Sequence, residues 1–152
     1  MTSKERVLQR ERDRGRLAAQ EVQDRATDMT GTELNAVEDR IPRFAVAVAR
    51  QNMLTRKVGF VCKSTAGRVV KLLQNYDSSI YPQEPEELPA QWGFVWSKDP
   101  AKAQPFVAIN TSPYMTGDCC IENGSTYRSK YDNNTAAPSA WPQGWEICEE
   151  EK

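Results

Sequence analysis

The chain contains two degenerate copies of one pattern, and this internal repeat limits its fold more than any single motif does. In each copy a glycine leads a short strand, a second glycine marks a tight turn into another strand, and a polar loop ends at a tryptophan. The leading and turn glycines are Gly59 and Gly67 in the first copy, eight residues apart, and Gly117 and Gly124 in the second, seven apart. The repeat predicts two small all-β modules in tandem, which are more often binding parts than catalytic ones.

Each copy carries the signals of a hairpin followed by a closing strand. Asn123-Gly124 is the strongest of them, because Asn-Gly suits the two-residue turns that join antiparallel strands. A module of about 45 residues is close to the lower size limit for an independent core, so we expect the modules to lean on each other or on neighbouring chains. The expected strands span residues 59–63, 68–74 and 92–96 in the first copy, and 125–131 and 145–148 in the second.

The N-terminal third is expected to be helical. Residues 3–27 are rich in good helix formers and contain no proline, and Ser3 can cap them. A second, shorter helix should start at the Thr32 cap and stop near Arg40, because Pro42 disfavours helix at the residue before it. Residues 43–57 suit either a strand or a helix, and we interpret them as a linker that packs on the β part.

The predicted fold class is therefore α+β, with an N-terminal helical segment followed by two small three-stranded modules. The predicted division is a helical anchoring or oligomerisation segment with its linker over residues 1–53, a first β module over 54–100 and a second over 101–152. Residues 1–57 carry twelve Lys/Arg and nine Asp/Glu, a local charge of +3, whereas residues 58–152 carry eight and twelve, a local charge of −4. This difference suggests that the two parts face different partners, although a solvated helix surface would account for it equally well.

Residue composition excludes several kinds of chemistry. The chain has no histidine, which rules out Ser-His-Asp and Cys-His nucleophiles and histidine-ligated metals. The four cysteines lack Cys-x-x-Cys spacing, and two of them are adjacent, which suits a tetrahedral zinc site poorly. We therefore expect reduced thiols, no metal, no cofactor and no enzymatic activity.

Membrane and nucleic-acid partners are not expected either. No apolar run approaches the roughly 20 residues of a membrane-spanning helix. The charged N-terminus does not resemble a signal peptide, so we expect synthesis in the cytoplasm. Arginines recur between residues 6 and 16, but acidic residues lie between them and no aromatic side chain is available there for stacking on bases. We expect this helix to dock on a protein assembly or to self-associate.

In the second copy, Tyr114 precedes the Gly117-Asp118 pair, and Asn123-Gly124, Tyr127 and Trp145 follow. This pattern resembles the small chitin-binding type of carbohydrate-binding module (families five and twelve), which combines an aromatic residue, a Gly-Asp strand start, an Asn-Gly turn, a Tyr and a closing Trp. Other segments look like short bacteriophage and prophage proteins that carry this module, with the similarity covering roughly residues 29–148. The family often places two exposed tryptophans where this chain has Tyr131 and Asp132. The residues that carry the resemblance are Tyr114, Gly117-Asp118, Asn123-Gly124, Tyr127, Pro142 and Gly144-Trp145 for the module, and Met29–Glu33, Ile41-Pro42, Leu72–Gln74, Ala90–Gly93, Asp99–Ala103, Tyr127–Ser129 and Asp132–Asn134 for the phage proteins.

A glycan-binding platform is the main candidate site. Sugar rings stack on exposed aromatic side chains, while amides and carboxylates bond their hydroxyls. The alternative is that Trp141 closes the small core and that the two asparagines only form a turn. The candidates are Tyr131, Asp132, Asn133, Asn134 and Trp141 in the second module, and Tyr76, Tyr81 and Trp96 in the first.

The resemblance implies a non-enzymatic structural protein of a phage virion, as a fibre, decoration or head- or tail-associated component. The helical part would anchor to other virion proteins or form a homo-oligomer, expected as a trimer, while the β modules would project and bind a host surface glycan. The alternative is a cement protein that joins virion subunits and binds no sugar.

Overall fold

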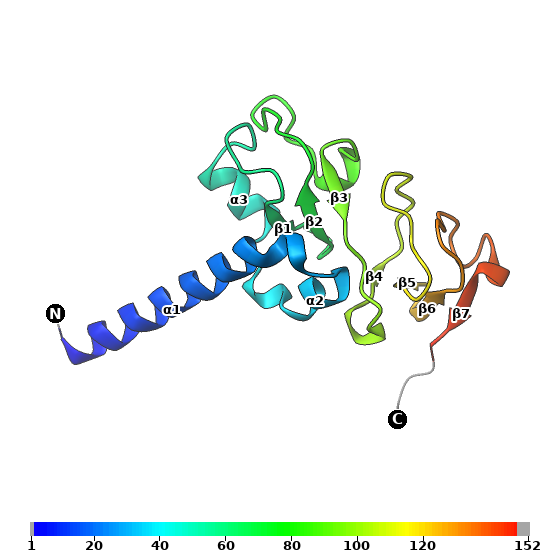
Figure 1. Ribbon diagram of the computed structural model, residues 1–152, viewed down its shortest axis with the longest axis horizontal. Coiled ribbons are helices and arrows are strands. Elements are labelled where there is room, and N and C mark those ends of the chain that lie inside the picture. The colour runs from blue at the N-terminus through cyan, green and yellow to red at the C-terminus, as the bar shows by residue number, and fades with distance from the viewer. Residues whose placement is uncertain (1, 149–152) are drawn as a thin grey trace.

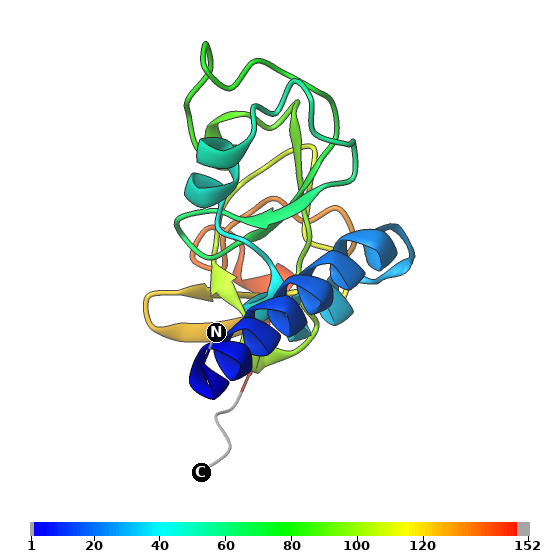
Figure 2. The ribbon, with the colours of Figure 1, turned by 90° about the vertical axis from the view of Figure 1, so that its left-hand side faces the viewer.

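The protein, described by a computed structural model over residues 2–148, has an α+β fold in which a long helix precedes a body with two sheets (Figure 1). Helix α1 spans Ser3–Arg25, and its N-terminal half stands away from the body. In Figure 2 the N-terminal end points toward the viewer, and the helix passes in front of the sheets. The acidic tail at residues 149–151 lies outside the described residues.

Both expected helices are present, but their caps lie earlier than expected, by one residue in the first helix and by two in the second. Thr2, rather than Ser3, caps α1 through a capping box with Glu5. Thr30, rather than Thr32, caps α2 (Gly31–Ala36) through a second box with Glu33. In both boxes the threonine hydroxyl accepts from a backbone N–H while the glutamate accepts from the threonine N–H, which satisfies two donors of the first turn. A 3₁₀ turn over Glu38–Arg40 then ends the helical run before Pro42.

The segment expected to be a linker is helix α3 (Phe44–Arg50). Its large–small alternation is compatible with helix because Phe44 and Ala47, three positions apart, fall on one face and are both buried. This short helix covers the first sheet and contributes to its core.

The first sheet is antiparallel, in the order β1 (Val61–Lys63), β2 (Val69–Leu72), β3 (Trp92–Phe94). The second sheet has four strands, because β4 (Gln104–Pro105) pairs in parallel with β5 before β6 and β7 follow in antiparallel order. The remaining bounds are β5 Cys119–Glu122, β6 Ser125–Ser129 and β7 Trp145–Ile147. The observed strands are shorter than the expected ones, since pairing stops where the loops begin.

The two sheets repeat the same hydrogen-bond register. Each leading glycine has a positive φ, 95° at Gly59 and 94° at Gly117, a region that side chains rarely adopt. Each donates a 2.8 Å hydrogen bond to the last residue of the second strand, Leu72 or Ser129. That last residue in turn pairs with the tryptophan of the closing strand: Leu72 with Trp92, and Ser129 with Trp145.

The repeat also extends upstream of the expected copies. A parallel bridge joins Arg43 to Lys63 in the first unit, and β4 makes the equivalent pairing in the second. A phenylalanine follows each pairing and packs edge-on against the tryptophan of its own sheet. The two pairs are Phe44–Trp92, with ring centroids 5.7 Å apart, and Phe106–Trp145, at 6.1 Å.

One aromatic core joins the two sheets. Phe94 stacks on Trp96, Trp96 on Tyr114 with centroids 4.2 Å apart, and Tyr114 meets Trp145 edge-on at 5.3 Å. The core therefore continues across the expected boundary between the two β modules at residues 100 and 101. The division into two modules at that position stays a prediction. The expectation that the modules lean on each other agrees with this packing.

Candidate functional site

The loop between β6 and β7 carries the second-module candidates and places two aromatic rings at the surface. Tyr131 and Trp141 are 50% and 38% exposed, and their rings stack with centroids 5.2 Å apart at an angle of 26°. The electron-rich face of an aromatic ring attracts the positively polarised C–H bonds of a sugar. The pair therefore provides an exposed aromatic surface of the kind that such a contact requires.

Trp141 keeps its position because residue 144 is glycine. A Cβ at Gly144 would come within 2.2 Å of the indole, which is closer than any real contact. Trp141 therefore lies against Gly144 and stacks on Tyr131, which remains the more exposed of the two rings.

Asp132 and Asn133 are exposed beside this pair. The Asp132 carboxylate accepts a 2.9 Å hydrogen bond from the Thr116 N–H, and this bond lowers the pKa of Asp132. Asn133 has a positive φ of 56°, and its N–H lies 3.4 Å from the sulfur of Met115. The side chain of Asp132 is thus held as an anion at the rim of the aromatic surface, where it can accept hydrogen bonds from hydroxyl groups.

The prediction that Asn134 belongs to the glycan platform is wrong, because this residue is buried, with 3% of its surface exposed. Its backbone pairs with Tyr114 in both directions, and its amide donates to Ser129 Oγ and to the Gly144 carbonyl. The side chain therefore holds the ends of the loop together and cannot reach a ligand at the surface.

The first-module candidates do not form a second platform. Tyr76 and Trp96 are buried, at 6% and 7% exposure, because their rings belong to the core. The Tyr76 hydroxyl accepts from the indole N–H of Trp92, and the Trp96 indole donates to the Ser112 carbonyl. Tyr81 is 52% exposed, but neither of the other two candidates joins it at the surface.

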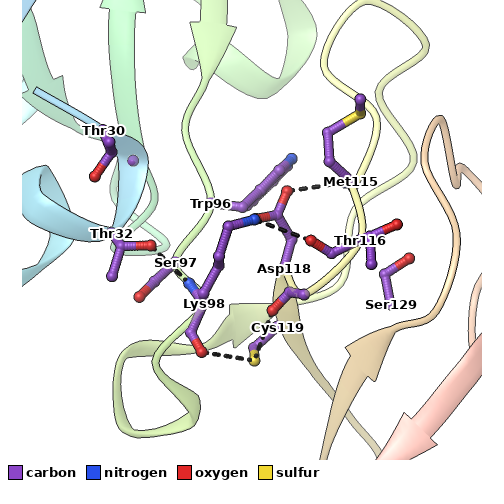
Figure 3. Close-up of polar contacts among 12 residues, drawn as sticks. Thr30, Thr32, Trp96, Ser97, Lys98, Met115, Thr116, Asp118, Cys119 and Ser129 are labelled. Carbon is purple, nitrogen blue, oxygen red and sulfur yellow. Dashed lines mark hydrogen bonds and ion pairs between the residues drawn. The ribbon is translucent and has the colours of Figure 1, made fainter. Parts of the chain in front are cut away.

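The sequence did not predict a cluster of polar contacts at the turn before β5, which lies next to the candidate loop (Figure 3). The Lys98 ammonium donates to the Thr116 carbonyl at 2.9 Å and lies 3.5 Å from the Asp118 carboxylate. Thr116 donates to Asp132 at the same time, so Lys98 is linked through Thr116 to the residue that follows Tyr131. Lys98 stands in a turn with no motif, and only the Gly117-Asp118 pair signalled this site in the sequence.

Asp118 is nearly buried beneath this cluster of polar contacts. Burial raises its pKa, while the N–H of Met115 and the ammonium of Lys98 oppose the effect. Asp118 supports the turn at residues 115–118 from within, and 7% exposure leaves it little contact with solvent.

Taken together, the site consists of a stacked aromatic pair, an ionised carboxylate and a nearby ammonium. Such a surface can stack on one face of a sugar ring and bond its hydroxyl groups. The chain contains no histidine, so no imidazole stands beside this surface.

Among residues 2–148, no helix is both long enough and apolar enough to span a membrane. No protein-family model, curated protein or solved structure matches the chain.

Proposed function

We propose that this protein is a non-enzymatic structural protein of a bacteriophage virion that attaches by its helical N-terminus and contacts a host surface glycan through Tyr131 and Trp141. The exposed stacked pair is the observation that carries the proposal. The resemblance of residues 29–148 to phage proteins with carbohydrate-binding modules supports the assignment to a particle.

The projecting helix supports attachment to an assembly. Val7 and Leu17 are 52% and 70% exposed, and Val22 is the buried residue of α1. A helix of this length with so little tertiary packing gains little stability by itself in water. Contact with other virion proteins or with further copies of the chain would cover these side chains.

Multivalency makes a weak surface site useful on a particle. A shallow surface with one open aromatic face binds a single sugar weakly, whereas many copies on a symmetric assembly bind together with far greater avidity. The proposed function therefore needs only modest affinity from each chain.

Glycan-array binding followed by titration of the best ligand tests the proposal. Replacing Tyr131 by Ala should weaken binding by about threefold to tenfold, the scale of one aromatic stacking contact, and Trp141→Ala should weaken it similarly because Tyr131 loses its support. Tyr81→Ala is the matched control, since it removes an equally exposed aromatic outside the site. Binding that is unchanged in both site variants would refute the glycan surface.

The alternative is a cement protein that joins virion subunits and binds no sugar. The exposed apolar side chains of α1 favour this alternative, because a helix that packs between subunits would expose the same side chains when the chain is free. Electron microscopy of the particle distinguishes the two functions: Tyr131 and Trp141 facing solvent supports glycan binding, and both rings covered by protein supports cementing.

A further inference from the structure

A polar cavity of about 380 Å³ lies between the C-terminal part of α1 and the segment over residues 51–60. The residues that line it do not include Tyr131, Asp132 or Trp141, so it is separate from the aromatic surface. Its volume falls within the roughly 300–1,000 Å³ range of small-molecule sites. Space and polarity together suit a small hydrophilic ligand.

Arg56 is held in one wall with hydrogen-bonding capacity to spare. Its Nη2 donates to the Ala47 carbonyl at 2.9 Å, and its guanidinium lies over the ring of Phe60 at 4.3 Å. Its Nε is buried without a partner, whereas Nη1 makes no hydrogen bond within residues 2–148, so Nη1 is the donor left for a ligand. These contacts fix the plane of the guanidinium before any ligand arrives.

The charges around the cavity favour an anion. Arg56 and Lys57 line one wall, and Asp24 on α1 is the acidic residue of the lining. The lining thus holds two cationic side chains and one carboxylate, and burial lowers the pKa of Arg56. A bound anion would relieve this excess of positive charge.

The rest of the lining carries amide and hydroxyl groups. Gln20 and Thr27 stand on the helical side, and Gln51 and Thr55 stand on the other. Gln20 already donates to Asp24 and Gln51 to Thr55, so the amide oxygens of the two glutamines remain to accept from the hydroxyls of a ligand.

We propose that this cavity binds a small hydroxylated anion of the size of a sugar acid, with its carboxylate or phosphate on Arg56 and Lys57 and its hydroxyls on the amide and hydroxyl groups of the two walls. The proposal does not depend on glycan binding at Tyr131.

Calorimetric titration of the whole chain with four probes tests the ligand class. Glucuronate and glucose 6-phosphate carry both the ring hydroxyls and an anion, glucose lacks the anion, and inorganic phosphate lacks the ring. We expect at least one of the two sugar acids to bind about tenfold more tightly than both glucose and phosphate, and the better one identifies carboxylate or phosphate as the preferred group. Equal binding of bare phosphate, or no binding of either sugar acid, would overturn the proposal.

Two charge variants with opposite expected effects locate the binding. Lys57→Gln should weaken sugar-acid binding by about tenfold, the scale of one charge-assisted hydrogen bond, and Asp24→Asn should strengthen it by removing a repelling charge. Arg12→Gln is the matched control, because it changes the net charge as Lys57→Gln does but alters an exposed residue outside the lining.

Circular dichroism establishes that each variant is folded before titration. Equal effects of Lys57→Gln and Arg12→Gln would show a general charge effect and refute the site. Tyr131→Ala should leave sugar-acid binding unchanged, so failure of this proposal and failure of the glycan surface are distinguishable.

Discussion

At the scale of single residues, a few side chains decide what the candidate loop can present to a ligand. Gly144 leaves room for the ring of Trp141, and the buried amide of Asn134 ties the loop ends together. Lys98 and Asp118 fix the neighbouring turn from the other side. The exposed face of Tyr131 is therefore positioned by residues that do not themselves reach the ligand.

Asp118 gives a pH dependence whose sign follows from its burial. Its pKa is raised in the folded chain, so the folded state holds the proton more tightly than the unfolded state does. Its contribution to stability is complete below the ordinary carboxyl value of 3.8 and is lost as pH rises through the folded pKa. Asp118→Asn keeps a neutral side chain at every pH and removes this dependence.

Urea unfolding of the wild type and Asp118→Asn between about pH 3 and pH 7 measures the effect. The stability of the wild type relative to the variant should decline as pH rises. Comparing the two proteins cancels the opposite contributions of Asp77 and Asp132, whose pKa values are lowered by hydrogen bonds. A constant difference across the range would contradict the prediction.

At the scale of elements, hairpins with glycine turns could be predicted from the sequence, whereas pairings without a local signal could not. Gly67 and Gly124 adopt the positive φ that their turns require, and strands lie on both sides of each. Strand β4 has only two residues, one of them proline, and its parallel partner is distant in sequence. Helix α3 was missed because β-branched and small residues alternate along it, and packing of Phe44 decides its conformation.

The candidate site was predictable only in part, because it too depends on contacts between residues that are distant in sequence. Polar and aromatic residues in one loop indicated a surface, but burial depends on contacts made far along the chain. Trp96 is covered because Tyr114, from the segment before β5, stacks on it, and Asn134 is covered because its amide bonds Ser129 at the end of β6 and the Gly144 carbonyl. No local pattern distinguishes such residues from exposed ones of the same type.

The link between β2 and β4 depends on one buried ion pair. Arg68 donates to Glu86 at 2.8 Å and, through Nε and Nη2, to the Pro105 carbonyl at 3.1 and 2.7 Å. Glu86 is mostly buried, with its Oε1 unpartnered. The guanidinium thus bridges the first sheet to the edge strand of the second.

Arg68→Met should destabilise the fold by about 3–5 kcal/mol, because it leaves the Glu86 carboxylate buried and uncompensated. Adding Glu86→Gln should restore much of that free energy, since the orphaned charge disappears. Chemical denaturation of the two single variants and the double variant gives the coupling. Additive losses would show that the two side chains act independently.

At the scale of the whole molecule, the chain divides into a body with a shared core and a helix that reaches beyond it. The helix is fastened near its C-terminal end, where Gln23 exchanges two hydrogen bonds with Val61 on the edge of β1, at 2.7 and 2.9 Å. These bonds cover an edge that could otherwise pair with another chain. The N-terminal half remains free to meet a partner.

Deleting residues 2–17 should leave the body folded while abolishing self-association. The deleted stretch contributes no buried residue, whereas Val22 and Ala26 remain to anchor the rest of the helix. Native mass spectrometry should show an oligomer, expected as a trimer, for the full chain and a monomer for the shortened one. A full chain that is monomeric at tens of micromolar would refute assembly through this helix.

The stacking of Trp96 on Tyr114 has an evolutionary consequence. Once two units bury rings against each other, neither can be lost, swapped or passed to another gene without leaving its counterpart with an uncovered hydrophobic face. Recombination should therefore have transmitted this pair as one inseparable block, and later change should concentrate in its outward loops.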